Sequence, residues 1–193
     1  MELRRAALVL ADIGHRIQLP TSREADLLHA EQHMAGLLEA VLAAIQPPLR
    51  LSKLENNGAF LFATGDSDGA TAQQVSAQMP ILFSAFQAKL QTLVAGRNCQ
   101  CQACLNLHLL RLTVVLHFGE VIFKQVRQFN ELAGEAVILL HRLNQNAAAA
   151  TASVRMSESF HQLAGGLAGK SPVRRTETAK GLGLVTVWVY EFG

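Results

Sequence analysis

A β-hairpin near residue 56 restricts the possible folds of this chain more than any other feature. Residues 49–54 (LRLSKL) alternate apolar and polar side chains, as a half-buried strand does, and residues 59–64 (AFLFAT) form a second apolar run. Between them, residues 55–58 (ENNG) are turn formers that end in an Asn-Gly pair, a strong hairpin signal. We therefore expect two antiparallel strands here, which excludes an all-helical bundle.

The segments on either side extend this hairpin into a sheet with helices. Residues 6–12 (AALVLAD) are a short continuous apolar run, the pattern of a central strand covered on both faces. Apolar residues near helical spacing predict a long helix over 23–45, which Pro47-Pro48 ends. The other predicted elements are a helix at 70–95, two strands at 109–117 and 120–126 joined tightly at Phe118-Gly119, helices at 134–146 and 156–164, a loop or weak strand at 165–181, and a strand at 183–192.

This order of elements predicts an α+β fold. Its βαββαβ core is the split-βαβ, or ferredoxin-like, arrangement, with helices on one face of a mixed sheet. The chain has 193 residues, 50% of them hydrophobic, which is enough for one substantial core. We expect a single domain over residues 1–193, with a cysteine-rich connection at about 97–108.

Charge and hydropathy limit the partners and the compartment. The net charge is +2 and no basic block is present, so nucleic acid is not an expected partner. No apolar run reaches the roughly 18 residues of a membrane span, and the apolar stretch near residue 8 is too short for a signal peptide. The cysteines crowd between Cys99 and Cys104, unlike a secreted disulfide framework. We expect a cytoplasmic protein without membrane contact.

Five motifs follow one another along the chain: ADI at 11–13, SKLENNGAFLFA at 52–63, CQCQAC at 99–104, VVLHFGE at 114–120 and ELAGEAVILLHRLNQN at 131–146. In this order they resemble the class III nucleotidyl cyclases and, more narrowly, an uncharacterised bacterial family of cyclase-like proteins. Class III domains build their sites across a head-to-tail pair, so the resemblance implies a homodimer. It also implies a nucleotide site that uses Mg²⁺ or Mn²⁺.

In that family two aspartates hold two metal ions, which activate the ribose 3′-hydroxyl for attack on the α-phosphate. Asp12 matches the first aspartate, and the backbone carbonyl of Ile13 lies beside it in the family pattern. At the second motif Asn56 replaces the glycine and Asn57 the aspartate. An amide oxygen can bind Mg²⁺ but carries no full charge, so the resemblance implies a degraded metal site. Strand alternation directs Glu55, a possible substitute ligand, to the opposite face from its neighbours.

Other positions of the family pattern are partly kept. Arg142 retains the arginine that stabilises charge on the phosphate, whereas Ile138 replaces the asparagine that orients the ribose. Lys53 and Glu131 match the pair that reads adenine, which favours ATP over GTP, and Lys180 resembles a triphosphate-binding lysine. Each residue also has an ordinary alternative role, such as a surface ion pair between Lys53 and Glu131.

The cysteine cluster predicts chemistry of its own. Cys99, Cys101 and Cys104 offer three soft ligands, and His108 follows one helical turn later. A closed structural zinc site needs four such ligands, so we predict Zn²⁺ held by the three thiolates and His108. Three reduced thiols in a turn, or a redox switch between neighbouring thiols, are the alternatives.

The changes at Asn57 and Ile138 lead to our main functional expectation. We expect a degenerate cyclase-like domain, catalytically inactive, that binds a nucleotide or a protein partner in a regulatory role. Two alternatives stay open. One is an active adenylate cyclase that uses a single strong metal site, and the other is a zinc-stabilised interaction module that binds no nucleotide.

Overall fold

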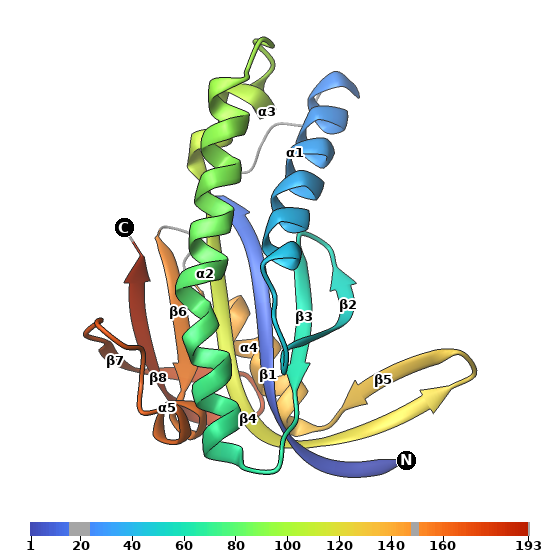
Figure 1. The fold of residues 1–193 in the computed structure, drawn as a ribbon, viewed down its shortest axis with the longest axis vertical. Helices are drawn as coiled ribbons and strands as arrows, with labels where there is room; N and C mark the ends of the chain where they lie inside the picture. The colour runs from blue at the N-terminus through green and yellow to red at the C-terminus, as the bar shows by residue number, and fades with distance from the viewer. Residues whose placement is uncertain (16–23, 148–150, 193) are drawn as a thin grey trace.

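The computed structural model describes residues 1–15, 24–147 and 151–192 and confirms the α+β fold (Figure 1). The strands form one sheet in the order β2-β3-β1-β4-β6-β8-β7, with β5 paired to β4. The strands are β1 (Glu2–His15), β2 (Arg50–Glu55), β3 (Gly58–Ala63), β4 (Leu110–Val126), β5 (Phe129–Ala133), β6 (Ala152–Ser157), β7 (Val173–Ala179) and β8 (Gly183–Phe192). The helices are α1 (Glu24–Ala43), α2 (Asp68–Ala95), α3 (Gln102–Leu105), α4 (Glu135–Gln145) and α5 (Glu158–Ala164), with a 3-10 turn, η1, at Leu107–Leu109.

The predicted βαββαβ core is formed by β1, α1, β2, β3, α2 and β4. Strand β1 lies antiparallel between β3 and β4, and the hairpin expected at 49–64 is β2–β3, in which Glu55 pairs with Gly58. The apolar run in β1 is buried on both sides, as expected of a central strand. Alternate side chains of this run, such as Val9 and Leu10, enter two different hydrophobic clusters.

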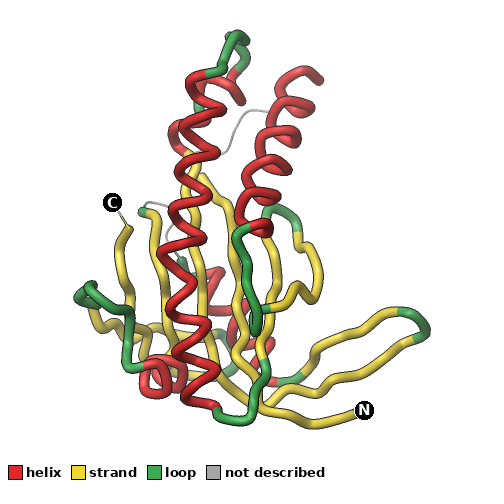
Figure 2. The backbone as a smooth tube through the Cα atoms, viewed as in Figure 1, coloured by secondary structure: helices red, strands yellow, loops and turns green. Residues whose placement is uncertain are grey.

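Helices cover both faces of the sheet rather than one face, which corrects one detail of the predicted arrangement (Figure 2). The larger cluster joins one face to α1, α2 and α5. The smaller cluster joins the other face to Ala136, Leu140 and Leu143 of α4. No helix in the described part of the chain is both long and apolar enough to cross a membrane.

The predicted turn at Phe118-Gly119 is wrong, because β4 runs without a break through this pair. Gly119 lies opposite Ala6 of β1 in the sheet. A Cβ atom at Gly119 would lie 2.9 Å from both the Ala136 Cβ and the His117 Nε2. The glycine therefore allows α4 to approach the strand closely, and it does not mark a turn.

Gly119→Ala is expected to lower the free energy of unfolding by about 1–3 kcal/mol, because the added methyl group overpacks the contact with α4. Urea denaturation measures this. The matched control is Gly69→Ala in the first turn of α2, where the new Cβ meets its nearest neighbour, the Leu163 carbonyl oxygen, at 3.8 Å. The control should be neutral or slightly stabilising. Equal effects of the two substitutions would contradict the packing argument.

Further differences from the predicted elements lie in the second half of the chain. The chain turns at Arg127, whose φ is 54°, and returns as β5, so that the β4–β5 hairpin projects from the body (Figure 1). The helix expected at 156–164 begins at Glu158, and β6 precedes it. The segment expected as loop or weak strand contains β7. The first residue of the helix expected at 23–45 lies outside the described residues.

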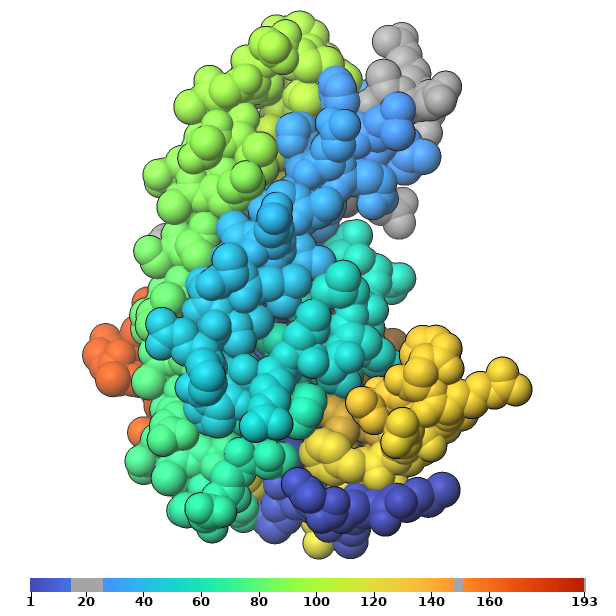
Figure 3. Space-filling view, turned by 45° about the vertical axis from the view of Figure 1, so that its right-hand side comes forward, coloured from blue at the N-terminus to red at the C-terminus, as the bar shows by residue number. Residues whose placement is uncertain are grey.

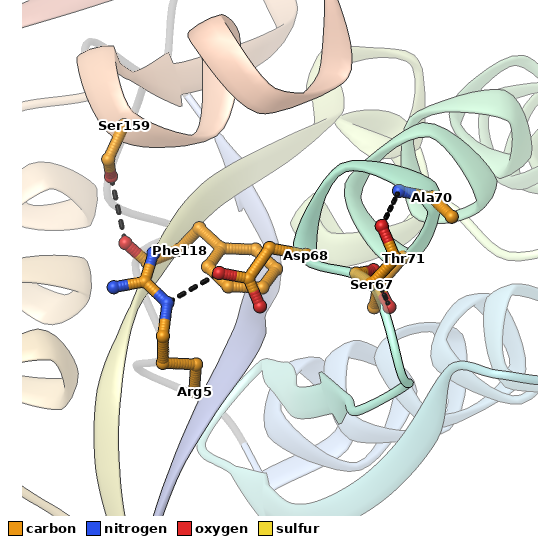
Figure 4. A network of polar contacts seen from close by, with 7 residues as sticks. All are labelled: Arg5, Ser67, Asp68, Ala70, Thr71, Phe118 and Ser159. Atoms are coloured by element: carbon orange, nitrogen blue, oxygen red, sulfur yellow. Dashed lines mark hydrogen bonds and ion pairs between the residues drawn. The ribbon is translucent and has the colours of Figure 1, made fainter.

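Polar contacts attach the start of α2 to the sheet (Figure 4). The Arg5 Nε of β1 lies 2.5 Å from the Asp68 Oδ2, and the Arg5 guanidinium lies over the Phe118 ring at 5.4 Å. Ser67 caps the helix by accepting a hydrogen bond from the Ala70 N–H. From there α2 runs for 28 residues, about 42 Å, and its far end extends beyond the ends of the strands (Figure 1). The cysteine-rich connection begins at that end.

Candidate functional site

Asp12 lies near the end of β1, on the face that α4 covers. Its Oδ2 accepts a hydrogen bond from the Asn144 Nδ2 of α4 at 3.4 Å. Partial burial raises the pKa of Asp12, and the hydrogen bond from Asn144 offsets only part of this rise. The carboxylate is therefore held by a neutral amide donor.

The β2–β3 turn lies directly beside Asp12. The Ile13 N–H donates a hydrogen bond to the Asn57 carbonyl at 3.1 Å. Asn56 has a φ of 45°, a conformation that asparagine tolerates, and the side chains of both asparagines are exposed. A Cβ at Gly58 would lie 2.6 Å from the Ala11 carbonyl oxygen, so only glycine fits this approach. The structure thus places Asp12, Ile13 and Asn57 together.

Glu55 shares the α4 face with Asp12 but is already paired. Its Oε2 lies 2.7 Å from the His141 Nε2 and its Oε1 lies 3.0 Å from the Lys53 Nζ. Partial burial raises the pKa of Glu55, but the hydrogen bonds from His141 and Lys53 outweigh burial and leave the pKa below its ordinary value. Glu55 and Asp12 both lie opposite Gly58 in the sheet, which puts their backbones about 10 Å apart. Glu55 is therefore no close substitute for the second aspartate.

The other residues implied by the resemblance are spread over the α4 side and the projecting hairpin. Lys53 pairs with Glu55, whereas Glu131 of β5 lies opposite Lys124 and lines a hollow of about 650 Å³ between the hairpin, β2 and the start of β1. The Arg142 Nη1 donates to the Gln145 Oε1 of its own helix at 2.9 Å. Ile138 is 52% exposed, and Lys180 is exposed in the β7–β8 turn.

A second group of reactive side chains lies at the far end of α2. One ligand atom each from His29, Cys99, Cys101 and Cys104 lies within 4.8 Å of all the others. The His29 Nδ1 is 3.3 Å from the Cys101 Sγ and 3.5 Å from the Cys104 Sγ. A fifth donor, the His33 Nε2, is 3.3 Å from the Cys104 Sγ. Three thiols and an imidazole at this spacing could hold a metal such as zinc.

His108 does not take part in this cluster, which corrects the predicted fourth ligand. It is exposed, and its Nδ1 lies 3.0 Å from the Leu105 carbonyl oxygen. The histidine that meets the cysteines is His29 of α1, which is 72 residues before Cys101. The available sequence signal was the spacing of His29 and His33, four residues apart on one helical face.

Backbone donors and burial affect the three thiols differently. The Cys101 N–H points at the Cys99 Sγ (3.4 Å) and the Cys104 N–H at the Cys101 Sγ (3.5 Å). Hydrogen bonds from the backbone and the thiol of Cys101 lower the pKa of Cys99. Burial, together with the neighbouring thiols, raises the pKa of Cys104 to about 12. Without a cation, three thiolates at this site would repel one another.

Comparison with known proteins assigns the chain to a family. A family model described as "Protein of unknown function (DUF2652)" matches residues 34–152, more than half of the chain. The chain belongs to the DUF2652 family. The matched range of this DUF2652 protein includes the β2–β3 hairpin, the cysteine cluster and α4.

One curated relative is the "Uncharacterized protein Rv2561/Rv2562" of Mycobacterium tuberculosis. It is 35% identical over 113 residues, which are 58% of the DUF2652 chain and 51% of the relative. The chain thus spans about half the length of this relative.

Solved structures establish the fold of the DUF2652 chain. The guanylyl cyclase Cya2 has a TM-score of 0.71 at 14% identity, covering 98% of this chain and 92% of that one. The adenylyl cyclase CyaB from P. aeruginosa has a TM-score of 0.71 at 14% identity, covering 100% and 97%. The guanylate cyclase domain of RhGC from Catenaria anguillulae, in complex with GTP, has a TM-score of 0.62 at 11% identity, covering 98% of each chain. The fold is that of a class III cyclase domain, as the motifs implied.

Proposed function

We propose that this protein is a degenerate cyclase-like domain without cyclase activity, which binds a nucleotide or a protein partner in a regulatory role. The observation that carries the proposal is the environment of Asp12. Its carboxylate is held by the Asn144 amide, and the neighbouring turn offers Asn57 where a second carboxylate is needed. We favour ATP as the nucleotide because Lys53 and Glu131 match the adenine-reading pair, although Lys53 turns to Glu55 in the isolated chain.

Charge is the reason that one carboxylate does not suffice. A nucleoside triphosphate carries several negative charges, and two divalent ions offset them while they activate the attacking hydroxyl. Mg²⁺ and Mn²⁺ bind anionic oxygens strongly and an amide oxygen weakly. Glu55 contributes no free charge because Lys53 and His141 already pair with it. The site therefore lacks the anionic ligands for two ions.

The ribose and phosphate positions on α4 support the same proposal. Ile138 and Arg142 are four residues apart and lie on one helical face. The exposed Ile138 side chain cannot hydrogen-bond a ribose, and Arg142 binds Gln145. An exposed isoleucine suits contact with another protein surface instead.

A homodimer is part of the proposal. Apolar side chains are exposed on β2, on the β4–β5 hairpin and on α4, namely Leu54 (57%), Val126 (53%), Phe129 (61%) and Ile138 (52%). Burying such side chains against a second copy would stabilise the pair by about 25 cal/mol per Å² of apolar surface.

Purified protein is expected to form no cyclic nucleotide from ATP or GTP above background with Mg²⁺ or Mn²⁺. Calorimetry with ATP analogues should detect binding without turnover. Asn56→Gly with Asn57→Asp restores the missing carboxylate and should tighten Mg²⁺-dependent ATP binding about tenfold or more. Turnover should further require Ile138→Asn.

The control for this experiment is Asn56→Gly alone, which adds no charge and should leave the affinity unchanged. Robust turnover by the unaltered protein would overturn the proposal in favour of an active adenylate cyclase. No nucleotide binding would leave the domain as a protein-binding module.

The Cys/His cluster favours a second candidate function, a zinc-stabilised interaction module that binds no nucleotide. Its supporting observation is the four donors within 4.8 Å of one another, at the opposite end of the molecule from the start of α2. Zinc in the purified protein, with no heat of binding for ATP or GTP, is the result that this candidate predicts.

A further inference from the structure

Among the described residues, the first turns of α1 make little hydrophobic contact with the rest of the domain. Leu27 and Leu28 are 47% and 55% exposed. The side chains of α1 that belong to the core or pack against it start at Met34 and continue with Leu37, Leu38, Val41 and Leu42. Burial of apolar surface is the main source of helix stability in proteins, so the segment before Met34 needs another means of attachment.

A polar face takes the place of the missing core in this segment. Asp26, His29 and His33 follow one another at intervals of three and four residues, which puts them on one side of the helix. Asp26 is only 5% exposed, and its Oδ1 accepts a hydrogen bond from the Gln102 N–H at 3.0 Å. Figure 3 shows this part of α1 lying beside the end of α2 and the connection to β4.

The donor atoms on this face and on the connection have nearly the separations of a tetrahedral zinc site. Zinc binds sulfur at about 2.3 Å and imidazole nitrogen at about 2.0–2.1 Å, which sets neighbouring ligand atoms about 3.5–3.8 Å apart. The His29 Nδ1 lies 3.3 and 3.5 Å from the sulfurs of Cys101 and Cys104. The set of four stays within 4.8 Å, so small side-chain rotations complete the tetrahedron.

We propose that Cys99, Cys101, Cys104 and His29 bind one Zn²⁺, which fastens the first half of α1 to the connection between α2 and β4. This inference rests on the zinc module named above as the second candidate function, and it does not depend on the nucleotide site. On binding, the three thiols release their protons to solvent and the sulfurs coordinate the ion as thiolates.

The surroundings of the cluster favour thiolates bound to a metal. Three sulfur ligands with one imidazole select zinc over magnesium or calcium, which prefer oxygen. The backbone N–H groups of Cys101 and Cys104 point at sulfur atoms and offset part of the thiolate charge. His33 lies beside the Cys104 Sγ, where its Nε2 can donate to the thiolate, so we assign it as a positioning residue.

Metal content tests the ligand set. Protein purified without chelator should contain about one zinc per chain, and after exchange with Co²⁺ it should show the visible absorption bands of a tetrahedral thiolate site. Cys101→Ser should weaken binding at least about 100-fold. His29→Ala combined with His33→Ala should remove the histidine contribution to the Co²⁺ spectrum. His108→Ala, a nearby exposed histidine, is the matched control and should keep full occupancy.

Two outcomes would overturn the ligand set. The first is far less than one metal per chain, accompanied by three freely titrating thiols or by a disulfide between two of the cysteines. The second is loss of metal in His108→Ala with retention in the His29 and His33 double variant. Neither outcome depends on nucleotide binding, so failure of the nucleotide proposal and failure of this inference remain distinguishable.

Hydrogen exchange with and without chelator tests the fastening role on the unaltered chain. Removal of zinc should reduce amide protection in α1 before Met34 and around residues 99–105, while β1 and α4 keep theirs. A fully loaded protein whose α1 exchange does not change on metal removal would overturn the fastening role. Because the readout is local and needs no variant, a substitution that prevents folding cannot obscure it.

Discussion

Glu177→Leu is expected to lower the free energy of unfolding by about 3–5 kcal/mol, because it leaves a buried guanidinium without its counter-charge. The Arg155 side chain of β6 is 5% exposed, and its Nη2 lies 2.5 Å from the Glu177 Oε1 of β7. The Arg155 Nε and the Glu177 Oε2 are buried and have no hydrogen-bond partner among the described residues. The positive charge of the buried Arg155 is therefore offset by the Glu177 carboxylate. Urea denaturation at neutral pH measures the loss.

Two comparisons separate the charge effect from a packing effect. Arg155→Met with Glu177→Leu removes both charges and should be much less destabilising than Glu177→Leu alone, and even close to neutral. Glu2→Gln breaks the ion pair between Glu2 (56% exposed) and Arg4 (52% exposed). This change should alter the free energy of unfolding by less than about 1 kcal/mol. If the double variant were as unstable as Glu177→Leu, lost packing and not the unpaired charge would be the cause.

The same buried charge explains why part of the sheet could not be predicted from the sequence. In β6 the side chains of Ser153, Arg155 and Ser157 are buried although they are polar. By its hydrophobic pattern this segment is too polar for a central strand. Arg155 is accommodated through its ion pair with Glu177 of β7, and the sequence does not show this contact. In contrast, β1 and the β2–β3 hairpin were predictable because apolar runs and turn residues are local signals.

The two candidate sites differ in predictability for a related reason. The position of Asp12 beside Asn57 follows from the pairing of β1 with the β2–β3 hairpin, in which Gly58 allows a close approach to the Ala11 carbonyl. The meeting of His29 with Cys101 depends on how α1 packs along α2, which no local pattern specifies. Spacing alone therefore favoured His108, the histidine nearest in sequence. Gly119 gave a false turn signal because the missing side chain allows α4 to pack closely against β4. That contact joins segments that are distant in sequence.

His117 is expected to make the protein less stable in mild acid. It is 8% exposed on β4, and burial lowers its pKa to about 4 from the ordinary value near 6.5. Its Nδ1 lies 2.8 Å from the Ser157 Oγ, so the ring has a neutral hydrogen-bond partner, and no ion pair joins it to a carboxylate of the described residues. The unfolded chain therefore binds a proton at a pH where the folded chain does not.

The sign of the effect follows from that difference in proton binding. The stability that the neutral ring contributes is fully present above about pH 6.5 and is lost as the pH falls toward 4, by about 3 kcal/mol. His117→Asn cannot titrate, so its unfolding free energy should fall less between pH 7 and pH 4 than that of the unaltered protein, by about this amount. Burial raises the pKa of Asp12, so Asp12 makes the folded protein relatively more stable as the pH falls. This contribution is the same in both proteins and cancels in the comparison. His108→Asn, at an exposed position, is the control and should leave the pH dependence unchanged. Parallel stability curves for His117→Asn and the unaltered protein would show that the ring is not buried in its neutral form.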